Sequence, residues 1–133
     1  RREEYTVLVI RDGGRGALHR RPAKGLLAGL YELPNLLGQR TSADVLDYVK
    51  ERGLVPMYLE PLAPAKHIFS HIEWRMNGYL VRVAALEEER SGDWLFVETE
   101  TAERDFPLPA AFNAYTSYMS IRLGPGGARK GEQ

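Results

Sequence analysis

Residues 41–54 read TSADVLDYVKERGL, and this stretch decides where the chain turns from sheet to helix. Thr41 and Asp44 have the spacing of a capping box, in which each side chain bonds to the backbone N–H of the other residue. The residues that line one side of such a helix are apolar, namely Val45, Leu46 and Val49. Gly53 can adopt the left-handed conformation that commonly ends a helix. The stretch therefore predicts a helix over 41–52 whose single apolar side packs against other elements.

Strand patterns lie on both sides of this helix. A β-branched run at 5–10 meets the turn-forming residues 12–14, so 17–20 is expected as its hairpin partner. Between 21 and 38 the glycines, leucines and two prolines predict an irregular, partly buried loop. Extended patterns after the helix predict further strands at 57–60, 65–69, 72–84 and 94–97.

The C-terminal part predicts a second helix. It is expected to open at Pro109 and to bury one apolar stripe, formed by Phe112, Tyr115 and Met119. The element order β-β-loop-α-β-β-β-α predicts an α+β sandwich, in which a mixed β-sheet is covered by two helices. We expect this domain to span 1–123 and the glycine-rich residues 124–133 to form a disordered tail.

The composition fits one domain with one core, since the chain has 133 residues and 44% of them are hydrophobic. The absence of cysteine excludes disulfides, thiolate zinc sites and iron–sulfur clusters from this chain. No apolar run approaches the roughly 20 residues that span a bilayer, and no signal-type region is present, so we expect a cytoplasmic protein that does not bind membranes. A chain that starts without Met, directly on a strand pattern, is expected to be one domain of a longer protein.

The strands, the loop and the helix that ends at 51–54 resemble the Nudix fold, whose enzymes hydrolyse nucleoside diphosphate derivatives with a divalent metal. The Nudix signature places an arginine and glutamates on this helix, because Mg²⁺ takes oxygen ligands. When the signature is anchored on Gly53, the corresponding positions hold Leu46, Asp47, Lys50 and Glu51. A lysine ammonium among metal carboxylates repels the ion, so we predict neither catalytic nor metal-ligating residues in this chain. A Mg²⁺-dependent Nudix nucleotide pyrophosphatase is the alternative function.

Three further pieces occur in order along the chain, and together they resemble the C-terminal domain of the MutY-type A/G-specific adenine DNA glycosylases. They are Leu18-His19-Arg20-Arg21-Pro22, the run GLLAGLYELP at 25–34, and His67-Ile68-Phe69-Ser70-His71. The family usually has tryptophan and phenylalanine where this chain has Tyr31 and Leu33, which are conservative departures. Residues 106–112 also fit, so the resemblance covers nearly the whole chain.

This resemblance implies a degenerate Nudix/MutT-like domain of base excision repair that recognises 8-oxoguanine mispaired with adenine in double-stranded DNA. A separate N-terminal domain of the parent glycosylase, a hydrolase, would carry the catalytic residues and a 4Fe-4S cluster, so no cofactor is expected in this chain. The expected partners are the mispaired DNA and that N-terminal domain. The chain is expected to be a monomer in the bacterial cytoplasm, associated with the nucleoid.

The resemblance assigns contact with the lesion to Phe69, Ser70 and His71. Guanine presents an acceptor at N7, whereas the oxidised base carries a hydrogen there and a carbonyl at C8. A hydroxyl both donates and accepts, so Ser70 can form a hydrogen bond with either group, and a backbone amide of the turn can do the same. Phe69 can stack on the base or wedge beside it, and His71 can touch a base edge or a phosphate. The local alternatives are that Phe69 closes the core and that Ser70 only forms the turn.

A second set of residues is expected to contact phosphates more weakly, and it comprises His19, Arg20, Arg21, Lys24 and Lys66. The alternative is that these are ordinary solvated side chains. His67 can face either side of its strand. Trp74 and Trp94 are expected in the core rather than as platforms for bases.

The charge balance limits what the chain can do alone. With 18 basic and 18 acidic residues the net charge is zero, which argues against tight DNA binding through phosphate contacts alone. Residues 11–40 hold six basic and two acidic side chains, and residues 83–105 hold two basic and eight acidic ones. Either the two stretches form separate basic and acidic faces of the molecule, or their charged side chains are scattered over the surface and solvated. A third reading is a protein-interaction domain that docks to a clamp or to repair partners through the acidic segment 87–105.

Overall fold

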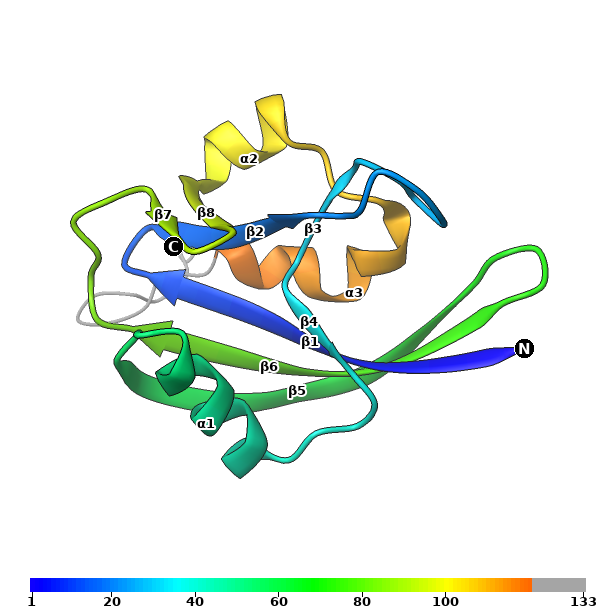
Figure 1. The fold of residues 1–133 in the computed structure, drawn as a ribbon, viewed down its shortest axis with the longest axis horizontal. Coiled ribbons are helices and arrows are strands. Elements are labelled where there is room, and N and C mark those ends of the chain that lie inside the picture. Colours follow the sequence, from blue (N-terminus) through cyan, green and yellow to red (C-terminus); the bar gives the residue numbers. More distant parts are fainter. Residues whose placement is uncertain (121–133) are drawn as a thin grey trace, which may run out of the picture.

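The structure, a computed structural model, describes residues 1–120, in which an eight-stranded sheet lies between helices (Figure 1). The strands are β1 (Arg2–Asp12), β2 (Arg15–Arg20), β3 (Tyr31–Glu32), β4 (Asn35–Leu37), β5 (Pro56–Ile68), β6 (Glu73–Val83), β7 (Arg90–Ser91) and β8 (Trp94–Glu98). The helices are α1 (Ser42–Glu51), α2 (Thr99–Asp105) and α3 (Asn113–Thr116), and the 3-10 turns η1 (Ala110–Phe112) and η2 (Ser117–Ser120) flank α3.

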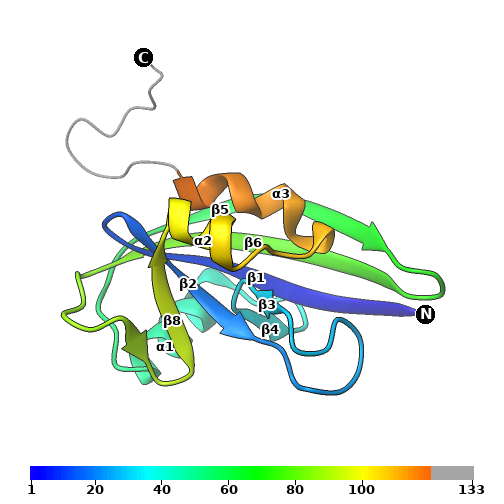
Figure 2. The same cartoon turned by 90° about the horizontal axis from the view of Figure 1, so that it is seen from above.

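The sheet is mixed. Its order is β5-β6-β1-β2-β8-β7, with β3 beside β2 and β4 beside β1. β1 and β6 run parallel from the pair Arg2 and Glu73 to the pair Arg11 and Arg82, and the other strand pairs are antiparallel. α1 covers one face of the sheet, and α2 and α3 cover the other (Figure 2). The predicted α+β sandwich with a mixed sheet is confirmed.

The core lies on both faces of β1, because successive side chains of a strand point to opposite faces. Val7 and Val9 belong to the buried cluster on the side of α2 and α3. The apolar stripe predicted for the last helix lies in the same cluster: Phe112, Tyr115 and Met119. Leu8 and Ile10 belong to the buried cluster on the other face, together with Val45 and Val49 of α1.

The helix predicted from the opening stretch is confirmed. The Thr41 hydroxyl accepts from the N–H of Asp44 at 3.1 Å, and the Asp44 carboxylate accepts from the N–H of Thr41 at 3.1 Å, so the capping box is complete. Gly53 has φ 84° and donates to the carbonyl of Lys50 at 2.9 Å, which ends the helix. Local signals at both ends therefore set α1.

The structure corrects three expectations. The loop 21–38 is not wholly irregular, because β3 pairs with β2 and β4 pairs with β1. The strands expected at 57–60 and 65–69 form one strand, β5, whose register shifts near its start, between Pro56 and Tyr58, and again between Leu62 and Ala65. Finally, α2 is a third helix that the sequence did not predict, since Ala102 is its only buried residue.

β5 runs along one edge of the described sheet and contains prolines at 56, 61 and 64. Proline lacks a backbone N–H, and strands tolerate it where that position faces away from the partner strand. The edge position therefore lets β5 continue past its prolines, although the register shifts next to Pro56 and Pro64.

α3 approaches the sheet closely at Gly78 of β6. A Cβ atom on Gly78 would lie 2.6 Å from Cε1 of the Tyr115 ring, so only glycine leaves room for the ring. Tyr115 is 1% exposed, and its hydroxyl donates to the carbonyl of Ala63 at 2.8 Å. Burial raises the pKa of this phenol to about 12.

Two expectations concern the C-terminus and membranes. The predicted tail 124–133, and the last residues of the predicted domain, lie outside the described residues. Within 1–120, no helix is both long enough and apolar enough to cross a bilayer.

Candidate functional site

The hairpin of β5 and β6 forms an arm whose tip projects from one end of the molecule (Figure 1). Its last strand pair joins Ile68 to Glu73, and the N–H of Phe69 donates to the carbonyl of Ile72 at 2.8 Å. Ser70 and His71 occupy the turn and are exposed. The turn that the sequence predicts at these residues is therefore present, and its side chains are accessible to a ligand.

Phe69 is partly buried, unlike its two neighbours in the turn. Its ring meets the ring of Trp74 edge-on at a centroid distance of 5.0 Å and the ring of His67 at 4.8 Å. Trp74 is 2% exposed, so it belongs to the core as expected. Phe69 is thus anchored on the core from the base of the tip, and His67 lies on the same side of the arm.

A hollow of about 460 Å³ opens beside the tip. Its lining residues come from the tip and from the start of β1, and they are Arg1, Arg2, Ile68, Phe69, Ser70, His71, Ile72 and Glu73. Ile68 is 64% exposed, so it presents apolar surface at this place. The hollow therefore combines cationic, hydroxyl and apolar groups.

Cations surround the only carboxylate of this hollow. A hydrogen bond from Arg75 lowers the pKa of Glu73, and the charges of Arg75, Lys66 and Arg2 act in the same direction. Sequence reasoning missed Arg2 and Arg75. The alternation of β6 contained the signal for Arg75, whereas Arg2 reaches the tip only through the parallel pairing of β1 with β6.

The residues predicted to contact phosphates fall into two groups. Arg20, Lys24 and Lys66 are exposed, although the Nε of Arg20 donates to the carbonyl of Gly29 at 3.0 Å. His19 and Arg21 instead contact carboxylates. His19 lies between two of them: its Nδ1 is 2.8 Å from the carboxylate of Glu32, and its Nε2 is 3.0 Å from that of Asp93.

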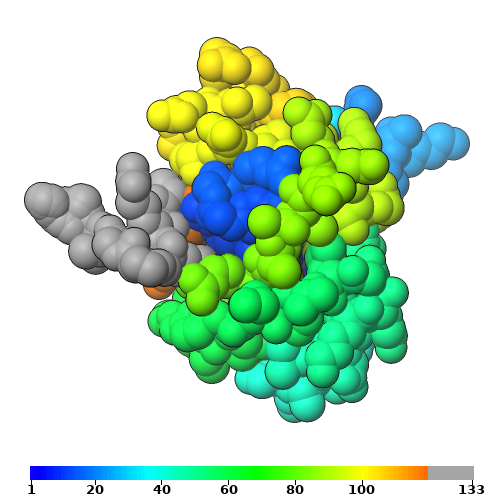
Figure 3. All heavy atoms as spheres, turned by 90° about the vertical axis from the view of Figure 1, so that its left-hand side faces the viewer, coloured from blue at the N-terminus to red at the C-terminus, as the bar shows by residue number. Residues whose placement is uncertain are grey.

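Arg21 binds Glu32 through Nη1 at 2.6 Å, and its guanidinium carbon lies 5.4 Å from the centroid of the Trp74 ring. The loop that follows Arg21 projects from the same end of the molecule as the tip of the arm (Figures 1 and 2). The acidic segment 87–105 contributes much of the opposite end, in yellow-green and yellow in Figure 3. This loop and the acidic segment thus lie at different ends, although the stretches 11–40 and 83–105 also meet where Asp93 lies 3.0 Å from Nε2 of His19.

The helix that would hold a metal in a Nudix enzyme carries few ligands here. Asp47, Lys50 and Glu51 are exposed, and Leu46 is partly buried. Among the described residues, no three His, Asp or Glu side chains gather where they would hold a metal ion. These residues do not fit the divalent metal of the Nudix hydrolases.

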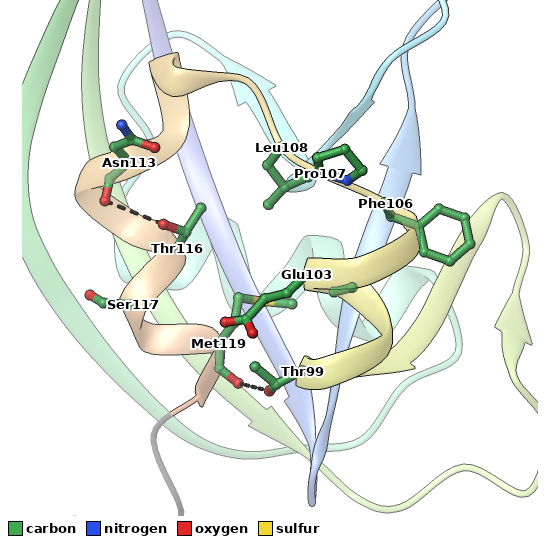
Figure 4. Close-up of a pocket in the computed structure, with 10 residues that line it drawn as sticks. Thr99, Glu103, Phe106, Pro107, Leu108, Asn113, Thr116, Ser117 and Met119 are labelled. Atoms are coloured by element: carbon green, nitrogen blue, oxygen red, sulfur yellow. Dashed lines mark hydrogen bonds between the residues drawn. The ribbon is translucent and has the colours of Figure 1, made fainter.

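A second hollow of about 350 Å³ lies between α2 and α3 (Figure 4). Its lining includes the apolar side chains of Phe106, Leu108 and Met119, and the Thr99 hydroxyl donates to the Met119 carbonyl at 2.9 Å. Glu103 is the one charged residue of this lining. A carboxylate without a cation disfavours an anionic ligand such as a nucleotide or DNA.

Comparison with known proteins finds one family and several solved structures of similar fold. The family model described as NUDIX domain matches residues 6–117. No curated protein matches the chain. The C-terminal domain of mouse MUTYH, solved in complex with human PCNA, superposes with a TM-score of 0.67 at 19% identity, covering 94% of this chain and 95% of that one.

Two other solved structures are similar to a comparable extent. A MutT NUDIX hydrolase from Burkholderia pseudomallei has a TM-score of 0.61 at 18% identity, with 93% of this chain and 99% of that chain covered. The E. coli ORF135 protein has a TM-score of 0.57 at 19% identity, with 94% and 96% covered. At these identities the structures establish the Nudix-like fold and leave the function to be argued from the site.

Proposed function

Because the chain belongs to the NUDIX domain family, whose model spans residues 6–117, we propose that it is a Nudix-like domain that has exchanged hydrolysis for recognition of damaged DNA. It senses 8-oxoguanine mispaired with adenine, as the lesion-recognition domain of a MutY-type adenine DNA glycosylase in base excision repair. It has no active centre of its own.

The observation that carries this proposal is the exposed Ser70 at the apex of an arm whose Phe69 is anchored on the core. The hydroxyl of Ser70 can accept from the N7 hydrogen of 8-oxoguanine or donate to its C8 carbonyl. The pieces of sequence that resemble the MutY-type domains support it, since the loop that precedes β3 and the tip of the arm project from one end of the molecule (Figure 1).

Hydrolysis is the competing function, because MutT hydrolases share the fold. Lys50 and Leu46 argue against it, since they stand where the Nudix signature has a carboxylate and an arginine. Lysine at the metal site adds repulsion where the enzyme needs a ligand. The chain therefore lacks the part of a Nudix enzyme that performs the chemistry.

The proposed partners are double-stranded DNA with the mispair and the N-terminal catalytic domain of the parent, which would hold the 4Fe-4S cluster. A bacterial cytoplasm with the nucleoid is the proposed location, and a monomer the proposed state. The mouse MUTYH domain was solved with PCNA, which supports a sliding clamp as a further partner. The acidic segment 87–105 is the surface to test, by pull-down with Glu87, Glu88 and Glu89 changed to glutamine.

Duplex binding tests the proposal. We expect the chain to bind a duplex with an 8-oxoguanine:adenine pair weakly, and to prefer it about tenfold or more over a guanine:adenine pair. Ser70→Ala should remove most of the preference, and any remainder measures the contribution of backbone amides at the turn. Ser42→Ala, a serine change on α1, is the matched control and should leave the preference intact.

Two results would overturn the proposal. One is equal affinity of the wild-type chain for the damaged and undamaged duplexes. The other is robust release of phosphate from nucleotides with Mg²⁺ that Glu51→Gln abolishes, since this would establish the hydrolase instead.

A further inference from the structure

Trp74 connects the tip of the arm to the rest of the molecule. Three aromatic rings surround its own, with centroid distances of 5.0 Å to Tyr5, 5.0 Å to Phe69 and 5.9 Å to Phe112. The guanidinium of Arg21 lies over the same ring at 5.4 Å. Phe69 packs on Trp74 and directly precedes Ser70. A change in the position of the Trp74 ring would therefore alter the proposed lesion contact through the ring of Phe69.

Arg21 is held in place more firmly than the other cations near the tip. Its Nη1 donates to Glu32 at 2.6 Å and its Nε donates to the carbonyl of Leu26 at 3.0 Å. Its side chain is 17% exposed and that of Glu32 is 6% exposed. The buried carboxylate of Glu32 has two side-chain partners, Arg21 and His19. Movement of Arg21 to a phosphate would remove one of them, and loss of a partner from a buried carboxylate is costly.

We propose that Arg21 is a positioning residue for the tip. Glu32 and Leu26 lock its guanidinium, the guanidinium covers Trp74, and Trp74 sets the orientation in which Phe69 meets the mispaired base. This inference rests on the proposed function. It differs from the role in phosphate contact that the sequence suggests for Arg21, because here Arg21 acts through another side chain and does not touch DNA.

The two roles predict different measurements. A phosphate contact contributes almost equally to every duplex, and its loss reduces the slope of log affinity against log salt by about one. A positioning residue leaves that slope unchanged and acts on the preference for the lesion. Lysine separates the roles further, because it keeps the charge but lacks the planar fork that binds a carboxylate and stacks on a ring.

The molecule contains a matched control for the stack. Arg52 lies 3.7 Å from the centroid of Trp94 and binds Asp93 at 2.7 Å. Trp94 is 2% exposed, like Trp74, but it belongs to the cluster on the face of α1. Arg52→Gln therefore removes a stacked, ion-paired arginine that has no contact with the tip.

The experiment measures the affinity of the full chain for duplexes with 8-oxoguanine:adenine and guanine:adenine pairs over a range of salt. Arg21→Gln, Arg21→Lys and Glu32→Gln should each lower the preference for the lesion about two- to fivefold with an unchanged salt slope. Arg52→Gln should retain the preference. Glu32→Gln is the sharpest variant, because it removes a negative charge and would improve DNA binding if only net charge mattered.

Ring resonances of Phe69 provide a second readout by NMR without DNA. They should shift in the Arg21 and Glu32 variants and stay in place in Arg52→Gln. If Glu32→Gln fails to fold in a thermal melt, Arg21→Lys carries the test.

Full preference in Arg21→Lys, or a salt slope reduced by about one in Arg21→Gln, would overturn the inference. If the wild-type chain has no preference, the proposed function fails, and unmoved Phe69 resonances in Arg21→Gln would then reject the positioning role separately.

Discussion

Single residues decide whether the helical layer fits the sheet, and Gly78 is the clearest case. Gly78→Ala places a Cβ 2.6 Å from the ring of Tyr115, which is buried and hydrogen-bonded. We expect the free energy of unfolding in urea to fall by about 1–3 kcal/mol, the usual cost of overpacking. Gly14→Ala is the control, because nothing lies within 4 Å of its Cβ. Equal stability of the two variants would mean that α3 does not press on β6.

Lys66 tests whether an exposed cation on the arm contacts phosphate. It is exposed and stands opposite Arg75 in the strand register, so the two positive charges face each other on the arm. Lys66→Gln should weaken binding to damaged and undamaged duplexes alike and reduce the salt slope by about one. Lys50→Gln on α1 removes the same charge elsewhere, and it should change neither the affinity for the duplexes nor the salt slope. A loss confined to the damaged duplex would contradict a phosphate contact.

At the scale of elements, α1 depends on its cap. Thr41→Ala removes the hydroxyl that accepts from Asp44 at 3.1 Å and should lower the free energy of unfolding by about 1 kcal/mol. Thr41→Ser keeps the hydroxyl acceptor, so it should retain most of the stability that Thr41→Ala loses. Urea melts followed by far-UV circular dichroism check both variants. If alanine and serine behaved alike, the capping box would contribute nothing measurable.

Elements with their own local signals were predictable from the sequence. α1 has a cap, an apolar side and a terminal glycine, and β1 has a β-branched run. α2 has one buried residue, Ala102, so its sequence lacks the apolar period that marks a helix. β3 and β4 span two and three residues and exist only through their partner strands.

The candidate site divides in the same way. The turn at Ser70 and His71 is a local feature, and its place at the tip of a hairpin followed from the flanking strands. The stack of Arg21 on Trp74 joins β6 to the residue after β2, and no neighbouring residue signals it. Charge alone placed Arg21 among phosphate contacts, because the sequence does not show that Glu32 is buried beside it.

At the scale of the whole molecule, Asp93 ties together segments that are distant in sequence. It accepts from Arg52 after α1 at 2.7 Å and lies 3.0 Å from Nε2 of His19 on β2. The hydrogen bond from Arg52 holds the pKa of Asp93 below its usual value. A carboxyl with a lower pKa in the folded chain stabilises the fold at neutral pH, and this contribution disappears as pH falls below the unfolded value of about 3.9 and through the folded one.

Asp93→Asn should therefore lower the free energy of unfolding at neutral pH by less than about 1 kcal/mol, since the side chain is 63% exposed and solvent screens the pair. The difference from wild type should narrow as the pH is lowered toward about 3. The midpoints of urea unfolding of the variant and the wild type, at neutral pH and at about pH 3, measure this difference. A difference that widens in acid would reverse the sign of this linkage.

The prolines of β5 have a consequence for how the chain behaves among its own copies. An extended strand at an open sheet edge normally offers a row of backbone donors on which a second chain can add itself. At 56, 61 and 64 β5 has no such donors to offer. An incoming chain therefore finds gaps in the row of donors along the first two thirds of β5, which disfavours continuous pairing of a second strand at this edge.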